Sequence, residues 1–201
     1  MGKEFLRYDT VRNDSIKLAH RIHMDGFVPD VIYVSLRGGA YMGNVISEYF
    51  KIVRRNQRPV FYAAVVARSY TDIHKQDRIM VDGWTYSPEY LRSGDKILMV
   101  DDIFDSGRTI NHLVEVIMEK GIPRDDIRVA VHDFKVRTFA SEILPIQPDY
   151  YCRKVLVDDP AKDIWIHYMS HELVGLDPQE IAEHYSQDPE VQQILSEFGS
   201  V

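Results

Sequence analysis

Four continuous apolar runs, separated by segments with helical spacing, constrain the fold of this chain more than any other feature. The runs are residues Asp30–Leu36, Pro59–Ala67, Ile97–Asp101 and Ile127–Phe134. Strands that are apolar along their whole length are typical of a parallel sheet buried on both faces, whereas a half-exposed sheet alternates apolar and polar residues. The pattern therefore predicts an α/β fold with a mostly parallel sheet flanked by helices.

Helical patterns fill most of the intervals between these runs. Apolar residues recur at helical spacing in Thr10–Met24 and Thr109–Lys120, and Tyr41–Val53 is also expected to be helical. The polar stretch Arg68–Trp84 has no clear period, so we predict a long loop there. A loop of that length in a compact domain is uncommon unless it has a function.

We predict a single domain in this chain of 201 residues, which is long enough to bury a sizeable core. The core is expected at about residues 10–140. After Leu144 prolines interrupt the pattern, which indicates a small C-terminal hood at about residues 145–175. Amphipathic helices without recognisable chemistry are expected at residues 177–199.

Composition narrows the class of protein. The formal net charge of −7 argues against general binding to nucleic acid. No apolar run approaches the ~20 residues of a membrane span, and the first residues lack the apolar centre of a signal peptide. The single cysteine, Cys152, cannot form a disulfide within the chain. We therefore expect a cytoplasmic protein whose partners are neither membranes nor nucleic acids.

The segment Lys96–Thr109 carries the strongest functional signal. An apolar strand leads into Asp101 and Asp102, a third acid follows at Asp105, and the sequence Ser-Gly-Arg-Thr then opens a helix. Carboxylate oxygens bind Mg²⁺ or sugar hydroxyls, and N–H groups at a helix start bind phosphate. The segment therefore indicates a ligand that is both a polyol and a phosphate ester. The alternative is a surface turn in which the acids and Ser106 only cap the helix.

A second loop with phosphate-binding features follows the first apolar run. Its sequence is Ser35-Leu36-Arg37-Gly38-Gly39. The glycines permit close approach of a phosphate, and the guanidinium of Arg37 suits phosphate oxygens. Ligands of open α/β sheets gather at the carboxyl ends of the strands, so we expect both loops to lie around one crevice. A plain turn between strand and helix is the alternative.

The segment Lys96–Thr109 resembles the phosphoribosyl-pyrophosphate (PRPP) motif of type I phosphoribosyltransferases. That motif has an apolar strand, two acids, two spacers, an acid, Ser or Thr, Gly, a spacer and Thr, and every position is filled here. Weaker similarities within Asp30–Glu172 point to the purine enzymes of the hypoxanthine-guanine and xanthine-guanine types. The resemblance implies the Rossmann-like type I fold with a small C-terminal hood. It also implies a homodimer or homotetramer.

The implied reaction is Mg²⁺-dependent transfer of ribose 5-phosphate from PRPP to N9 of hypoxanthine, guanine or xanthine, with release of pyrophosphate. Asp105 is the implied catalytic residue, because its counterpart in the family exchanges a proton with the purine near N7. The implied PRPP-binding residues are Asp101, Asp102, Asp105, Ser106, Gly107, Arg108 and Thr109. The implied metal-associated residues are Asp101, Asp102 and Glu172.

Further roles follow from the same resemblance. The implied pyrophosphate-binding residues are Leu36, Arg37 and Gly38, and in the family the peptide bond before the basic residue can be cis. The implied flap residues, which would cover the site and exclude water, are Arg68, Ser69 and Tyr70. The implied purine-binding residues are Lys135, Trp165 and Ile166. Taken singly, such residues are also common as a solvated lysine, an exposed loop or a core tryptophan.

Two questions stay open at this point. The preferred purine is one, because Met169 and Ser170 stand where a Pro-Trp pair often follows in the xanthine-guanine type. The other is whether the chain is an enzyme or a regulatory protein that keeps the fold and senses PRPP. A phosphoryl-transfer domain fits less well, since the sequence contains no GxxxxGK loop.

Overall fold

The computed structural model describes residues 2–72, 75–140 and 143–199. It divides into two compact units. The larger unit is Asp9–Asp163, and the smaller unit combines Met1–Tyr8 with Ile164–Val201.

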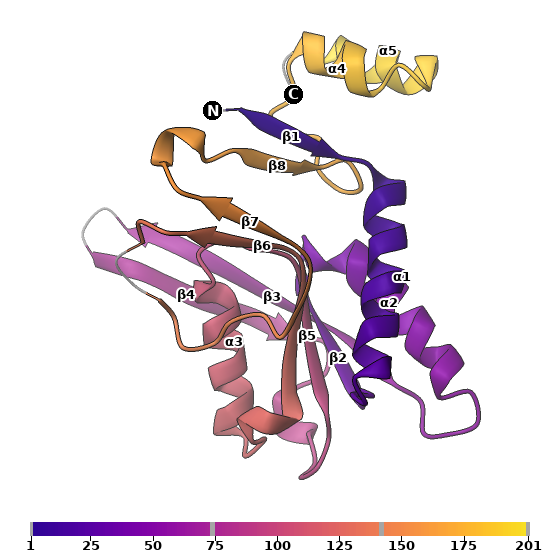
Figure 1. Ribbon diagram of the computed structural model, residues 1–201, viewed down its shortest axis with the longest axis vertical. Coiled ribbons are helices and arrows are strands. Elements are labelled where there is room, and N and C mark those ends of the chain that lie inside the picture. Colours follow the sequence, from indigo (N-terminus) through magenta and orange to yellow (C-terminus); the bar gives the residue numbers. More distant parts are fainter. Residues whose placement is uncertain (1, 73–74, 141–142, 200–201) are drawn as a thin grey trace. The chain divides into compact units, whose positions relative to one another are not determined.

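The larger unit is built on a six-stranded sheet (Figure 1). The strand order is β4-β3-β2-β5-β6-β7, and every neighbouring pair is parallel except β3 and β4. The strands are β2 (Val31–Leu36), β3 (Phe61–Asp72), β4 (Lys75–Trp84), β5 (Ile97–Phe104), β6 (Ile127–Arg137) and β7 (Tyr150–Val157). The predicted α/β fold, a mostly parallel sheet flanked by helices, is confirmed.

Helices cover both faces of this sheet (Figure 1). α1 (Tyr8–Met24) and α2 (Gly39–Val53) lie on one face, and α3 (Arg108–Glu119) lies on the other. Within the described residues, short 3-10 turns occur in the connections at η1 (Pro88–Tyr90), η2 (Arg124–Asp126) and η3 (Pro160–Lys162).

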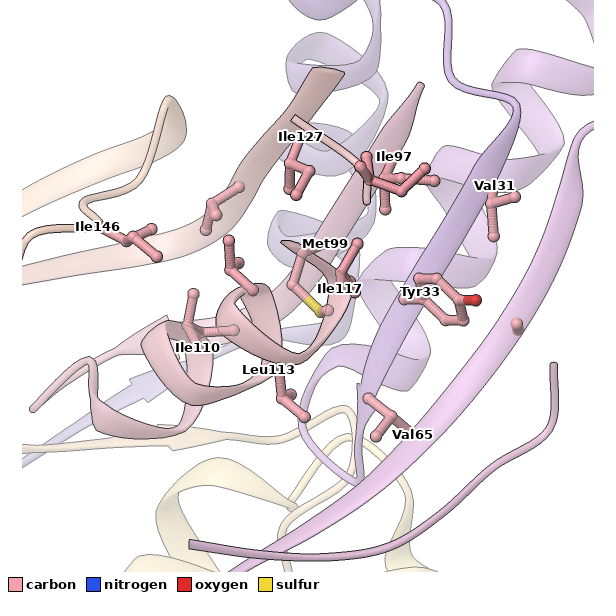
Figure 2. Packing of buried hydrophobic residues seen from close by; sticks show 14 of the residues in the cluster. Val31, Tyr33, Val65, Ile97, Met99, Ile110, Leu113, Ile117, Ile127 and Ile146 are labelled. Carbon is pink, nitrogen blue, oxygen red and sulfur yellow. The ribbon is translucent and has the colours of Figure 1, made fainter. Parts of the chain in front are cut away.

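The side chains of β5 show why the central strands are apolar along their whole length. Ile97 and Met99 pack against α3 in one buried cluster, part of which Figure 2 shows. Leu98 and Val100, the intervening residues, belong to a second cluster with side chains from α1 and α2. Because successive side chains of a strand point to opposite faces, a strand covered on both faces needs apolar residues at every position.

The prediction of a long loop over Arg68–Trp84 is wrong. The chain instead continues β3 to Asp72 and returns as β4, which pairs antiparallel with it and places Ser69 opposite Ile79. Residues 73–74, which also fell within that predicted loop, lie outside the described residues. An antiparallel pair is held by backbone hydrogen bonds, so it can form without the apolar periodicity on which the prediction relied.

The smaller unit contains two parallel strands and two helices. β1 (Lys3–Leu6) pairs with β8 (Trp165–Tyr168), and α4 (Pro178–His184) and α5 (Pro189–Glu197) follow. Its apolar cluster consists of Phe5, Leu176, Ile181, Tyr185 and Leu195.

The boundaries of this unit differ from those of the predicted hood. The hood was expected from about residue 145, but β7 is an integral strand of the main sheet. The smaller unit also includes the N-terminal strand β1, which pairs with β8 although the two are far apart in sequence. Whether the two units act as a catalytic core and a hood stays a prediction. Within the described ranges, no helix has the length and apolar character that a membrane crossing requires.

Candidate active site

Two strand-to-helix loops lie side by side at one edge of the larger unit. β2 and β5 are parallel neighbours, with Val34 paired to Val100, so the loops that follow them start at the same edge. α2 and α3 begin directly after these loops, and neither N-cap residue, Gly38 or Gly107, provides a side-chain cap. The exposed N–H groups and the positive dipole end of a helix start favour anions. The edge therefore offers two neighbouring anion-binding positions.

The first of these loops is Leu36–Gly39, which leads from the end of β2 to the start of α2. The peptide bond between Leu36 and Arg37 is cis. A Cβ atom at Gly38 would overlap the carboxylate of Asp102, and one at Gly39 would lie 2.5 Å from the carbonyl oxygen of Val100. Both positions therefore require glycine if the loop is to approach the end of β5 so closely.

The acids Asp101 and Asp102 form a buried corner at the end of β5. The N–H of Asp102 donates to Asp101 Oδ1 over 3.1 Å, and the N–H of Ile103 donates to Asp102 Oδ1 over 2.8 Å. Burial, followed by repulsion from Asp102, raises the pKa of Asp101 well above its usual value, although a hydrogen bond from Ser35 acts in the other direction. A nearby cation or sugar hydroxyl would lower the cost of burying this pair.

The second loop, Asp105–Thr109, turns tightly between β5 and α3. Gly107 has a φ of +76°, and a Cβ atom there would overlap the ring of Phe104. The N–H of Arg108 donates to Ser106 Oγ over 3.5 Å, which is a long hydrogen bond. Glycine at position 107 thus allows the chain to turn over the Phe104 ring and enter α3.

Lys135 and Asp105 lie close together beside the second loop. Lys135 Nζ lies 3.6 Å from Asp105 Oδ1, although the two residues come from different strand ends. The ammonium is almost fully buried, with 5% of the side chain exposed, whereas the Asp105 carboxylate is half exposed.

Sequence reasoning missed two further members of this cluster. Arg137 Nη2 donates to Asp105 Oδ1 over 2.6 Å, and Arg137 Nε donates to Asp163 Oδ2 over 2.8 Å. Lys135 Nζ donates to the other oxygen of Asp163 over 2.6 Å. Burial alone would raise the pKa of Asp163, but hydrogen bonds from Lys135 and Arg137 hold it below its usual value. The spacing of Lys135 and Arg137, two residues apart on one strand, was the available signal.

A cavity of about 590 Å³ opens beside this cluster within the larger unit. Asp105, Ser106 and Arg108 line it from the β5–α3 loop, and Lys135 and Arg137 line it from β6. Its remaining lining is mostly apolar, contributed by Phe104, Phe134, Val136, Ala140, Ile143 and Leu144 together with the polar Thr138, Gln147 and Lys154. A pocket with apolar walls and a few convergent polar groups is typical of small-molecule sites.

The predicted flap residues lie in the antiparallel pair rather than in a loop. The register places Arg68 opposite Met80, Ser69 opposite Ile79, and Tyr70 opposite Arg78. The guanidinium of Arg68 forms two hydrogen bonds with the Asp82 carboxylate, 2.5 and 2.7 Å long. Their role in covering the site stays a prediction.

The remaining predicted site residues belong to the smaller unit. Trp165 starts β8 with 53% of its surface exposed, whereas Ile166 is buried. The indole Nε1 of Trp165 donates to Glu172 Oε2 over 3.3 Å, and the N–H of Tyr168 donates to the same oxygen over 3.2 Å. Glu172 is thus engaged locally, and its predicted role near a metal stays a prediction.

The acidic corner fits Mg²⁺ in the chemistry of its donors. Mg²⁺ is bound through oxygen, keeps several waters, and commonly takes only one or two carboxylates from a protein together with substrate phosphates. Asp101 and Asp102 supply such carboxylates next to both anion positions. Among the residues with described positions, no group of three His, Cys, Asp or Glu side chains could hold a metal by itself. A magnesium ion at this corner would therefore need oxygens from a bound substrate.

Comparison with known proteins identifies the class. Residues 3–161 match the phosphoribosyl transferase domain family. The chain therefore belongs to the phosphoribosyltransferase family, whose fold has the mostly parallel, helix-flanked sheet described above.

The individual relatives share only a small fraction of their residues with this chain. The bifunctional protein PyrR of Halalkalibacterium halodurans is 24% identical over 164 residues, which cover 77% of this chain and 84% of that protein. A purine phosphoribosyltransferase from Pyrococcus horikoshii has a similar structure, with a TM-score of 0.64 at 19% identity and coverage of 88% of this chain and 99% of that chain.

Two other solved structures share the fold. A hypothetical protein from Neisseria gonorrhoeae with bound ppGpp gives a TM-score of 0.63 at 18% identity, covering 98% of this chain and 96% of that chain. The xanthine-guanine-hypoxanthine phosphoribosyltransferase of Helicobacter pylori gives 0.55 at 19% identity, covering 84% and 91%. At these identities the likeness concerns the fold, and the substrate has to be argued from the site.

Proposed function

We propose that this protein is a purine salvage enzyme that transfers ribose 5-phosphate from PRPP to N9 of a 6-oxopurine base. The products are the nucleoside 5′-monophosphate and pyrophosphate. The observation that carries the proposal is the pair of neighbouring anion-binding loops, separated by the acidic corner, with Lys135 and Asp105 beside one of them. PRPP has phosphate groups at both ends of a sugar, so it matches two anion positions joined by a polyol site.

The two loops divide the phosphates of PRPP between them. Residues Ser106–Thr109 hold the 5-phosphate at the start of α3, and residues Leu36–Gly38 hold the pyrophosphate at the start of α2. Asp101 and Asp102 accept hydrogen bonds from the ribose hydroxyls. When bound at this corner, Mg²⁺ supplies positive charge to the departing pyrophosphate.

The base is recognised by residues beyond the PRPP motif. Lys135 donates a hydrogen bond to the exocyclic oxygen of the purine, because an ammonium has donors but no acceptor. Asp105 exchanges a proton with the ring near N7. Trp165, Ile166 and Glu172 belong to the smaller unit. The proposal keeps the roles that the resemblance implies for them, which are purine binding for Trp165 and Ile166 and association with the metal for Glu172. Arg68, Ser69 and Tyr70 belong to the strand pair that excludes water from the sugar cation formed during transfer.

The proposal also covers the cellular location and the oligomeric state of the protein. We expect a cytoplasmic enzyme that acts on small molecules and forms a homodimer or homotetramer. A PRPP-binding regulatory protein is the second candidate, because the PyrR relative is described as bifunctional. The two differ in a simple respect: the enzyme turns PRPP over, whereas a regulator that only senses PRPP binds it unchanged.

One assay separates these candidates. The protein is incubated with PRPP, Mg²⁺ and one base at a time, chosen from hypoxanthine, guanine, xanthine, adenine, uracil and orotate, and nucleotide and pyrophosphate are measured. The proposed function predicts product with at least one 6-oxopurine and little with adenine. PRPP binding without product from any base would favour the regulator. A pyrimidine as the best substrate would contradict the base assignment.

A further inference from the structure

Four charged side chains form one continuous chain of contacts, and three of them, Asp105, Lys135 and Arg137, line the cavity. Asp105 contacts Arg137, Arg137 contacts Asp163, and Asp163 contacts Lys135. Lys135 in turn lies 3.6 Å from Asp105, which closes the ring. With two positive and two negative members the ring carries no formal net charge.

The inner members of this ring are the most buried. The side chains of Lys135 and Asp163 are 5% and 10% exposed, and that of Arg137 is 22% exposed. Buried charges of this kind keep a defined geometry because each depends on its partner for the interactions that water no longer provides. The outer member, Asp105, is half exposed toward solvent.

Asp163 fixes the direction of the Lys135 ammonium. It accepts from Lys135 through Oδ1 and from Arg137 through Oδ2, so both of its oxygens are used within the ring. An ammonium has three donors. One donor is held by Asp163, and Asp105 Oδ1 lies 3.6 Å from the same nitrogen, so the ammonium has a fixed place between the two carboxylates.

Arg137 fixes Asp105 in the same manner. Besides its 2.6 Å contact with Asp105 Oδ1, it donates through Nη1 to the backbone carbonyl oxygen of Asp105 over 3.2 Å. A planar guanidinium that holds both the carboxylate and the backbone of one residue restricts the rotation of that side chain. Both of the ring's contacts fall on Oδ1, which leaves Oδ2 outside the ring.

We propose that Arg137 and Asp163 are positioning residues that set the distance and direction between the Lys135 ammonium and the Asp105 carboxylate, and thereby select bases that carry an acceptor oxygen beside a ring nitrogen. The inference rests on the proposed function, in which these two groups read O6 and N7 of a purine. Neither residue needs to touch the base. An adenine-like amino group in place of the oxygen would meet a fixed donor with another donor, and such mismatches are strongly disfavoured.

The test compares Arg137→Met and Asp163→Asn, singly and together, with the wild-type enzyme. We expect the KM for the base to rise by about 10–100-fold, the usual scale for a displaced contact near the reacting centre. The KM for PRPP should change less than the KM for the base, because the ring contacts the loop before α3 only at Asp105 and leaves Ser106–Thr109 in place. The double variant should be no worse than the poorer single variant, since both changes disrupt the same ring.

A matched control is available at the other end of β6. Arg124 pairs with Asp149 over 3.1 Å at similar exposure, 32% and 22%, and lies outside the cavity lining described above. Arg124→Met should leave both KM values unchanged. A purely structural role for Arg137 or Asp163 would lower the amount of folded enzyme, and therefore kcat, without changing the KM for the base.

Two further measurements keep the outcomes distinct. If Arg137→Met does not fold, Arg137→Lys retains the charge but loses the fork, and it should raise the KM for the base by a smaller factor. The ratio of guanine to adenine turnover should fall in Asp163→Asn. A wild-type enzyme active on 6-oxopurines with an unchanged base KM in the variants would overturn the inference alone. A wild-type protein inactive on every base would overturn the proposed function as well.

Discussion

At the scale of single residues, the neighbours of each side chain decide what chemistry it can perform. Asp105 lies between two cations, Arg137 and Lys135, whereas Asp101 is half-buried and lies against another carboxylate. The repulsion between Asp101 and Asp102 favours a bound cation there. Asp101 and Asp105, four positions apart in the sequence, therefore have different surroundings.

Replacement of Asp105 tests the role proposed for it. Asp105→Asn keeps the size of the side chain but cannot exchange a proton, so kcat should fall by about 10²-fold or more. The KM for PRPP should be nearly unchanged, because the phosphate-binding loops are intact. Steady-state kinetics with guanine and PRPP measure both constants. Asp158→Asn, at an acid whose side chain is 70% exposed, is the control and should behave as wild type. Near-normal kcat in Asp105→Asn would exclude the assignment.

Two glycines allow the steric demand of the phosphate-binding loop to be measured. Gly107 and Gly121 both have positive φ, +76° and +89°, but only Gly107 has a neighbour, the Phe104 ring, where a Cβ would lie. Gly121→Ala should lower the free energy of unfolding by ~1 kcal/mol through the backbone alone. Gly107→Ala should lower it by about 1–3 kcal/mol more, because the ring must move. Urea unfolding measures the difference, and equal effects would show that the ring yields without cost.

At the scale of elements, the charged side chains of the proposed site lie at the ends of strands and in the segments that follow them, not in the strand middles. The carboxyl end of β6 carries Lys135 and Arg137, and the segment after η3 supplies Asp163. This ion ring joins the end of β6 to the loop that precedes α3. The buried apolar residues in the middle of each strand fix the strand in the sheet, and this determines the position of its carboxyl end.

The pKa of Asp163 predicts how this junction responds to acid. Its folded pKa lies below the ordinary value of 3.8, so above about pH 4 the carboxylate contributes its full stabilisation. As the pH falls through the folded pKa, the unfolded chain binds the proton first and the stabilisation is lost. The free energy of unfolding should therefore fall less steeply below about pH 4 in Asp163→Asn than in the wild type. Urea titrations at several pH values measure the two slopes, and parallel curves would contradict the prediction.

At the scale of the whole molecule, the proposed magnesium site is complete only when a substrate is bound. Asp101 and Asp102 offer carboxylates, but within the described ranges no third ligand joins them to close a metal site. Cation and substrate should therefore bind cooperatively.

Thermal unfolding tests this cooperation. Mg²⁺ alone should leave the Tm nearly unchanged, while Mg²⁺ with PRPP should raise it, because only a ligand that binds the folded state stabilises it. Removal of Mg²⁺ with EDTA should abolish turnover but leave the Tm of the substrate-free protein as it was. Mg²⁺ that raises the Tm strongly without PRPP would indicate a metal site formed by the protein alone.

Much of the fold could be predicted from the sequence, for a physical reason. The buried strands and the helices between them depend on local composition and period. The secondary structure of a segment such as Ile97–Asp101 can therefore be predicted without reference to the rest of the chain. The strand pair β3–β4 could not be found in this way, because its pairing uses backbone groups that every residue has. The pairing of β1 with β8 was missed for the same reason.

The candidate site likewise contains some residues that could be predicted from the sequence and some that could not. The PRPP motif is contiguous, so its acids, glycine and helix start can be read directly from Lys96–Thr109. Arg137 and Asp163 are separated in sequence and become a unit only through contacts with Lys135 and Asp105.

The sequence alone determined the class of fold and the position of the two loops proposed to bind phosphate, because hydrophobic period and loop chemistry are local properties of the chain. Only the tertiary structure decided which distant charges meet. The ring of Asp105, Arg137, Asp163 and Lys135 exists because parallel strands bring their carboxyl ends to one edge of the sheet, and at that edge burial makes each charge depend on its neighbour.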